Sequence, residues 1–190
     1  MEDGLIQKRL SEHIIVFGKM LADPYLASQV EVAAWNISEA FKKGNRVLIC
    51  GNGGSAADAQ HMAAEFVGRY LKERKALPAI ALTTNTSTLT AIGNDYGYEH
   101  VFSRQIEALA NKGDVVIGIS TSGNSSNIIY ALDAAKKKGC YTIGLVGGKQ
   151  CRIDSAADLV IKAPSENTPR IQEMHIFLIH TICEVVENGL

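Results

Sequence analysis

Residues 46–65, RVLICGNGGSAADAQHMAAE, join a short apolar run to a glycine-rich loop and then to a helical pattern. The run 46–50 is partly β-branched and is followed at once by glycine, which is typical of a buried strand. After the loop 51–54 the pattern changes to the longer period of a helix over residues 55–70. A strand, a tight glycine loop and a helix in this order predict an α/β protein.

The rest of the chain repeats this alternation. Short apolar runs recur at residues 79–83, 114–120, 141–146 and 158–162, and helical stretches lie between most of them, notably at 126–138. Near-continuous apolar strands that alternate with helices are typical of a parallel sheet with helices on both faces. We therefore expect three layers, in the order helix, sheet, helix.

Three further helices are expected outside this alternation. Residues 5–21 and 26–43 carry apolar side chains at spacings of three and four, which predicts two amphipathic helices before the first strand. The last segment, 169–187, begins with Thr168 as the expected N-cap and Pro169 at the first helical position. Its apolar residues lie nearly all round the helix, and such a helix must be enclosed on every side. We expect another subunit to supply part of that enclosure, with the N-terminal extension 1–44 packing in a homo-oligomer.

Composition restricts the class of protein further. The 190 residues fit one domain over 1–190, and 46% hydrophobic with 21% charged residues is close to the average for soluble globular proteins. A net charge of −1 gives no nucleic-acid footprint, and no apolar run approaches the ~18 residues of a membrane span. The N-terminus lacks a signal peptide, and the four scattered cysteines contain no C-x-x-C pair. We expect a cytoplasmic protein that binds neither nucleic acid nor membrane.

Two loops that follow predicted strands are candidate ligand sites. Residues 51–56 have the form of a dinucleotide-binding fingerprint, but residues 80–85 contain no acidic side chain for the ribose, and the sequence has no ATP-binding G-x-x-x-x-G-K-[ST] loop. The second loop, 120–126, offers hydroxyls and amides without lysine or arginine. Such groups at a helix start suit a compact phosphate. Ordinary turn and cap chemistry would explain either loop alone, but the two together favour a small phosphorylated ligand.

Polar side chains on two predicted helices form a second candidate site. His61 and Glu65 are four residues apart and share a helix face, which suits two metal ligands, or a base beside an acid, or an ordinary exposed pair. The last helix carries Gln172, Glu173 and His180, which would be costly in so apolar a helix without partners. By angle around the helix, Glu173 aligns with His180 better than Gln172 does.

Four motifs, taken in order, carry a resemblance to a known family. They are GNGGSAADAQHMAAE (51–65), GNDYG (93–97), ISTSGNS (119–125) and RIQEMHIFLIH (170–180). Together they resemble the sugar isomerase (SIS) domain family, and within it the bacterial sedoheptulose 7-phosphate isomerases, or phosphoheptose isomerases. The resemblance covers essentially the whole chain. It implies a flavodoxin-like three-layer αβα fold and a tetramer with active sites between subunits.

The resemblance also implies a reaction. It is the aldose–ketose isomerisation of D-sedoheptulose 7-phosphate to D-glycero-D-manno-heptose 7-phosphate through an enediol(ate), the first step towards ADP- or GDP-heptose for bacterial lipopolysaccharide or capsule. Glu65 and His180 would be catalytic, and His61, Glu65, Gln172 and His180 would hold one Zn²⁺ ion per subunit. The implied substrate-binding residues, besides Glu65 and Gln172, come from both loops and from the GNDYG motif: Asn52, Gly53, Gly54, Ser55, Asn94, Asp95, Ser120, Thr121, Ser122 and Ser125.

These residue types suit that chemistry. Moving a carbonyl between C2 and C1 needs a base and an acid, and a carboxylate and an imidazole can fill those roles when their pKa values are tuned towards neutral. Two histidines, a glutamate and a glutamine form an N/O donor set that is compatible with zinc, although glutamine is an unusual ligand. A tightly bound glutamate is a weaker base, so we expect Glu65 to bind the ion loosely or intermittently.

Two questions stay open at the level of sequence. Gln172 and His180 are separated by about 12 Å along a helix axis. Both can reach one ion from the same helix only with extended side chains. The alternative is a site assembled across a subunit boundary. The alternative function is a non-catalytic SIS adaptor, like the protein that associates with the DnaA initiator. The complete set of metal ligands and acid–base groups favours the isomerase.

Overall fold

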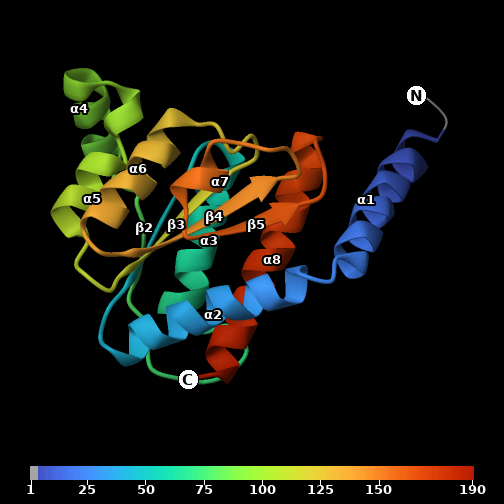
Figure 1. Ribbon diagram of the computed structural model, residues 1–190, viewed down its shortest axis with the longest axis horizontal. Coiled ribbons are helices and arrows are strands. Elements are labelled where there is room, and N and C mark those ends of the chain that lie inside the picture. The colour runs from blue at the N-terminus through green and yellow to red at the C-terminus, as the bar shows by residue number, and fades with distance from the viewer. Residues whose placement is uncertain (1–3) are drawn as a thin grey trace.

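The computed structural model describes residues 4–190, and its centre is a five-stranded parallel sheet between two helical layers (Figure 1). The strands are β1 (Val47–Gly51), β2 (Ala79–Ala81), β3 (Val115–Ser120), β4 (Tyr141–Gly147) and β5 (Leu159–Ala163). Their spatial order is β2-β1-β3-β4-β5, and all neighbouring strands are parallel. This is the flavodoxin-like order. The expected three-layer fold is therefore confirmed, with each strand within two residues of its predicted bounds.

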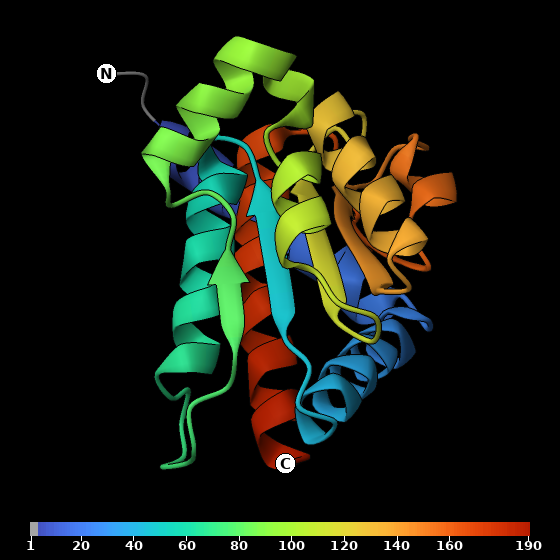
Figure 2. The same cartoon turned by 90° about the vertical axis from the view of Figure 1, so that its left-hand side faces the viewer.

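Helices cover both faces of the sheet. They are α1 (Leu5–Ala22), α2 (Leu26–Lys42), α3 (Gly54–Val67), α4 (Thr86–Tyr96), the 3-10 helix η1 (Tyr98–His100), α5 (Ser103–Leu109), α6 (Ser126–Lys137), α7 (Ile153–Ala156) and α8 (Thr168–Asn188). One apolar cluster lies between the sheet and α2, α3 and α8, and a second lies between the sheet and α5, α6 and α7 (Figure 2). Strand β1 serves both clusters, because its side chains point alternately to opposite faces.

Two local predictions need correction. Helix α3 ends at Val67, three residues earlier than predicted, and Asn167 rather than Thr168 is the N-cap of α8. Asn94 and Asp95 of the GNDYG motif lie in the last turn of helix α4, and Gly97 follows that helix with a positive φ. Helix α4 has no buried residue, so its sequence carries no apolar stripe to reveal it.

Helix α1 lies beside α8, away from the sheet (Figure 1). Of its residues only Val16 and Met20 are buried, whereas Ile14 is 68% and Leu21 90% exposed. Helix α8 is not enclosed all round by the described residues, because its Phe177 is 43% exposed and faces an apolar groove of about 680 Å³ that α1 and α2 also line. Within residues 4–190, no helix combines the length and the apolar character needed to cross a membrane.

Candidate active site

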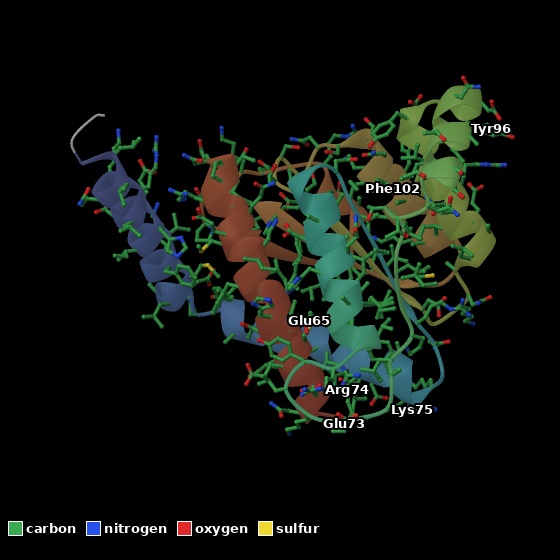
Figure 3. The ribbon with its side chains drawn as sticks, turned by 180° about the vertical axis from the view of Figure 1, so that it is seen from behind. Glu65, Glu73, Arg74, Lys75, Tyr96 and Phe102 are labelled. Atoms are coloured by element: carbon green, nitrogen blue, oxygen red, sulfur yellow. The ribbon has the colours of Figure 1, made fainter. Side chains whose placement is uncertain are left out.

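The candidate site lies where helices α3 and α8 run side by side in the same direction. Gln172 at the start of α8 contacts Gly54 at the start of α3, and His180 contacts His61 further along both helices. A Cβ atom on Gly54 would lie only 2.1 Å from Nε2 of Gln172, so any side chain at this position would push the Gln172 amide aside. This parallel pairing brings together two of the sequence motifs that lie far apart in the chain. Figure 3 shows Glu65 on α3 at the seam between the two helices.

His61, Glu65 and His180 converge at this seam. The Nε2 atoms of His61 and His180 are 2.8 Å apart, and Nε2 of His61 is 3.2 Å from Oε1 of Glu65. One ligand atom from each of the three residues lies within 4.8 Å of the others. The His61 side chain is 43% exposed and that of Glu65 is 22% exposed, so the cluster is open to solvent on one side. Two imidazole nitrogens and a carboxylate oxygen turned towards one point are a donor set that fits a divalent metal ion such as zinc.

Gln172 stands apart from this cluster. Its amide lies at Gly54, seven residues before His61 on α3, which corresponds to about 10 Å along the helix. The structure therefore brings together three of the four proposed metal ligands within one chain. Gln172 lies instead on the side of the first loop.

The competing residue Glu173 has partners outside the cluster of His61, Glu65 and His180. Its carboxylate accepts hydrogen bonds from Arg170 and contacts Nδ1 of His13 on α1 at 2.8 Å. These partners hold the pKa of Glu173 below its usual value, against the opposing effect of burial, which is the largest single influence. Glu173 belongs to the contact between α1 and α8, and the helical angle that aligned it with His180 did not identify a site residue.

The first glycine-rich loop is a tight turn held by its own backbone. Gly53 has a φ of 56°, a conformation that favours glycine, and the Ser55 N–H donates to the Asn52 carbonyl at 3.0 Å. An added Cβ on Gly51 would lie 2.3 Å from the Ser55 carbonyl oxygen, so this position also needs glycine. The turn buries Ser55, which is 3% exposed, at the N-terminus of α3. The positive end of the α3 dipole therefore faces the carboxyl edge of the sheet.

The second loop gathers hydroxyl groups around a buried serine. Ser120, 4% exposed, lies 3.1 Å from Ser125 through their Oγ atoms, and its Oγ also accepts from the Gly123 N–H at 3.1 Å. Thr121 and Ser122 line a cavity of about 240 Å³ that extends to the start of α8. Helix α6 begins directly after the loop, so a second positive helix end is added to these hydroxyls. Hydroxyl groups and the positive end of a helix suit the binding of a negatively charged phosphate group.

A reciprocal pair of amides joins the first loop to the start of α6, the helix that follows the second loop. The Nδ2 group of Asn52 donates to Oδ1 of Asn127, and Nδ2 of Asn127 donates to Oδ1 of Asn52, each at 2.9 Å. The Tyr98 hydroxyl donates to the same Asn52 oxygen at 3.3 Å. Asn94 and Asp95 bond to each other on the exposed surface of α4, so Tyr98 is the residue through which this region contacts the first loop. The sequence analysis missed Asn127 and Tyr98, although an asparagine inside the apolar stripe of α6 was a usable signal.

Asp58 is another site residue that the sequence analysis missed. It lies on the face of α3 that carries Gly54, His61 and Glu65, between the Gln172 contact and the histidine pair. Its Oδ2 atom is buried without a hydrogen-bond partner among the described residues. Burial raises the pKa of Asp58 to about 6, and the neighbouring His61 offsets part of that rise. A carboxylate near His61 with one oxygen that lacks a hydrogen-bond partner within residues 4–190 suits a cation at the seam.

Comparison with known proteins places the chain in a family. The model of the SIS domain matches residues 21–147. The phosphoheptose isomerase of Trichlorobacter lovleyi is 55% identical over 98% of this chain and 94% of that protein, and the one of Aliarcobacter butzleri is 62% identical over 80% of both chains. The chain belongs to the phosphoheptose isomerase family of SIS domain proteins.

Solved phosphoheptose isomerases share the whole architecture. The structure of phosphoheptose isomerase GmhA from Neisseria gonorrhoeae has a TM-score of 0.89 and 42% identity, and covers 96% of this chain and 97% of that chain. The phosphoheptose isomerase from Francisella tularensis has a TM-score of 0.92 at 33% identity, with 96% of each chain covered. Because the match extends over nearly all of the chain, it includes helices outside the α/β alternation. The membership of the phosphoheptose isomerase family that the sequence motifs indicated is confirmed.

Proposed function

We propose that this chain is the isomerase that converts D-sedoheptulose 7-phosphate into D-glycero-D-manno-heptose 7-phosphate. The observation that carries the proposal is the convergence of His61, Glu65 and His180 at the α3–α8 seam, beside two loops rich in hydroxyls and glycine. Relatives named phosphoheptose isomerase, which match up to 98% of the chain, support the same reaction. The product would enter the synthesis of ADP- or GDP-heptose for surface glycans, in the cytoplasm.

The chain's own residues supply the proton transfers. Glu65 is the proposed base that removes the proton from C1 of the ketose, because its carboxylate is only partly exposed and lies beside two imidazoles. His180 is the proposed acid–base partner that moves protons at the O1 and O2 atoms. Both groups come from packed helices, so their separation is fixed before the substrate binds.

The phosphate and the sugar would occupy opposite sides of the first loop. Ser120, Thr121, Ser122 and Ser125, with Ser55 from the first loop, are the proposed phosphate ligands. Asn52, Gly53 and Gly54, together with Asn94 and Asp95 on α4, are proposed to line the sugar. The amide pair between Asn52 and Asn127 supports this division, because it fixes the distance between the phosphate loop and the sugar loop.

His61, Glu65 and His180 would hold the proposed Zn²⁺ ion, with Gln172 as the fourth ligand. When bound, the ion would polarise the substrate carbonyl as a Lewis acid. Gln172 would have to turn from Gly54 towards His180, or act across a subunit boundary. The exposed apolar residues of α1 and the open groove beside Phe177 support a homo-oligomer, which we propose to be a tetramer with sites between subunits.

The proposal is tested by assaying the purified protein with sedoheptulose 7-phosphate, after chelation and again after Zn²⁺ is restored. Turnover that disappears on chelation and returns with Zn²⁺ would support both the isomerase and the metal. Turnover that is indifferent to chelation would keep the isomerase and remove the metal role of His61 and Gln172. An intact fold with no turnover in either state would favour the non-catalytic adaptor instead.

A further inference from the structure

A buried ion pair closes the far end of the α3–α8 seam. Glu187 lies in the last turn of α8, with its side chain 3% exposed, and pairs with Nε of Arg74 at 2.9 Å. Three consecutive backbone N–H groups, those of Tyr70, Leu71 and Lys72, donate to the same carboxylate at 2.7–3.0 Å. We call Arg74 and Glu187 the clasp. Figure 3 shows Arg74 on the loop that passes the C-terminal end of α8.

The position of Glu187 is unfavourable without these partners. A carboxylate in the last turn of a helix faces the negative end of the helix dipole, and burial removes its hydration. Burial alone would raise the pKa of Glu187. The three N–H groups form an anion-binding nest that stabilises the charged carboxylate and lowers this pKa to about 2. Burying a charge at this point serves to tie the loop 68–78 to α8.

Arg74 also caps the helix that carries Glu65. Its Nη1 donates to the Phe66 carbonyl at 2.9 Å, and its Nη2 donates to the Glu65 carbonyl at 2.8 Å. The last carbonyls of a helix have no partner within the helix, and α3 has no basic residue in its last turn. Glu65 itself lies in that last turn. The helical position of the proposed base therefore depends on an arginine that Glu187 holds in place.

The same loop reaches His180. The ring of Tyr70 lies 5.8 Å from the His180 ring between centroids, at an interplanar angle of 36°. Because the Tyr70 N–H is bound by Glu187, the clasp fixes the start of the loop that holds this ring against the imidazole. Glu65 and His180 come from different helices, and the clasp is bonded to both helices.

We propose that Arg74 and Glu187 are positioning residues that set the geometry between Glu65 and His180. The inference rests on the proposed isomerase activity and adds two residues to it that touch no substrate. Loss of the clasp should let the last turn of α3 fray and should displace the Glu65 carboxylate. The phosphate loops lie at the opposite end of α3, so substrate binding there should persist.

The test compares Arg74→Gln and Glu187→Gln with the matched control Asp114→Asn. Asp114 is a second buried carboxylate that pairs with an arginine, Arg46, and accepts backbone N–H groups, but it lies at the other end of β3 from the second loop. In steady-state assays at a temperature where every variant is folded, both clasp variants should lose about 10–100-fold in kcat, with KM for sedoheptulose 7-phosphate changed less than about twofold. Asp114→Asn should lose thermal stability but keep its kcat.

Hydrogen–deuterium exchange gives a second readout. The amides of residues 65–72 should exchange faster in the clasp variants than in the wild type. Should Glu187→Gln fail to fold, Tyr70→Ala removes the ring from His180 without removing a buried charge, and the same loss of kcat is expected. The inference would be overturned if the folded variants of Arg74, Glu187 and Tyr70 had the same kcat as Asp114→Asn. A wild-type protein without turnover would instead overturn the proposed function, and the inference with it.

Discussion

The Nε2 atoms of His61 and His180 lie 2.8 Å apart although 119 positions separate the two residues in the chain. The contact exists because α8 returns to the face of the sheet that α3 already covers and runs parallel to it. Two histidines at this distance, with Glu65 beside them, form the centre of the candidate site. The position of His180 in an apolar helix is thereby explained, since its polar edge meets the seam while its neighbours on α8 fill the core.

Replacing Glu65 tests the proposed base. Glu65→Gln keeps the shape of the side chain but cannot accept the C1 proton, so kcat should fall by about 10²–10⁴-fold. KM should change little, because the phosphate ligands are untouched. Steady-state kinetics at saturating Zn²⁺ measure both, with the exposed Glu107 on α5 replaced as Glu107→Gln for comparison. Near-normal turnover of Glu65→Gln would show that another group takes the proton.

Zinc should stabilise the fold as well as support turnover. A ligand that binds only the folded state raises the melting temperature, and the stabilisation grows with the logarithm of the ligand concentration divided by Kd. We expect added Zn²⁺ to raise the melting temperature of the chelated wild-type protein, and to raise that of His61→Ala and His180→Ala much less. The measurement is thermal unfolding with and without the ion. An equal rise in all three proteins would place the bound zinc elsewhere.

The buried Ser120 should control the affinity for phosphate. Ser120→Ala removes one hydrogen bond to a charged group, which is worth about 1.5–3 kcal/mol and corresponds to a rise in KM of about tenfold or more. Because Ser120 does not touch the reacting carbons in the proposed arrangement, kcat should stay close to that of the wild type. Ser155→Ala, at the surface of α7, is the control. A variant whose KM is unchanged would remove the second loop from the phosphate site.

His175 should make the fold sensitive to acid. It is fully buried, its Nε2 lies 3.2 Å from the Val146 carbonyl oxygen, and desolvation lowers its pKa from 6.5 to about 4. The His175 side chain therefore becomes protonated near pH 6.5 in the unfolded chain but only near pH 4 in the folded chain. Its contribution to the free energy of unfolding is fully present above pH 6.5 and is lost as the pH falls towards 4. Between pH 7 and pH 5 the free energy of unfolding should fall by about 2 kcal/mol because of this residue.

Urea unfolding at the two pH values measures this effect. His175→Leu should lower stability at pH 7, because the Val146 carbonyl loses its partner, but the loss of stability between pH 7 and pH 5 should be smaller than in the wild type. An identical pH dependence in both proteins would mean that His175 is not the group responsible.

The sequence predicted the sheet well because its central strands β1, β3 and β4 are buried on both faces. Runs such as 115–119 carry no polar side chain, and the glycine loop 51–54 marks the end of β1 without ambiguity. Helix α4 escaped prediction because none of its residues is buried. Local pattern therefore identified the strands and helices that carry a clear apolar pattern, the largely exposed α1 included, and missed α4.

The site was less accessible to sequence reasoning. The spacing of His61 and Glu65 revealed one face of α3, but only the three-dimensional path of α8 decides which of its polar residues meets that face. Helical angle favoured Glu173, whereas packing against α1 turns Glu173 towards His13. The structure places His180, which the family motifs implied as a metal ligand, next to His61. Local pattern can mark a buried asparagine such as Asn127 as unusual, but it cannot show that its partner is Asn52, 75 positions away.

The most direct test of the account is to run the isomerisation of sedoheptulose 7-phosphate in D₂O and to follow the substrate and product by NMR. Proton transfer by Glu65 through an enediol predicts that the wild-type protein forms the heptose phosphate with solvent deuterium at C2, and that Glu65→Gln forms neither product nor exchanged substrate at a comparable rate. Product formed without any deuterium, or equal exchange by both proteins, would contradict the assignment of the α3–α8 seam as an acid–base active site.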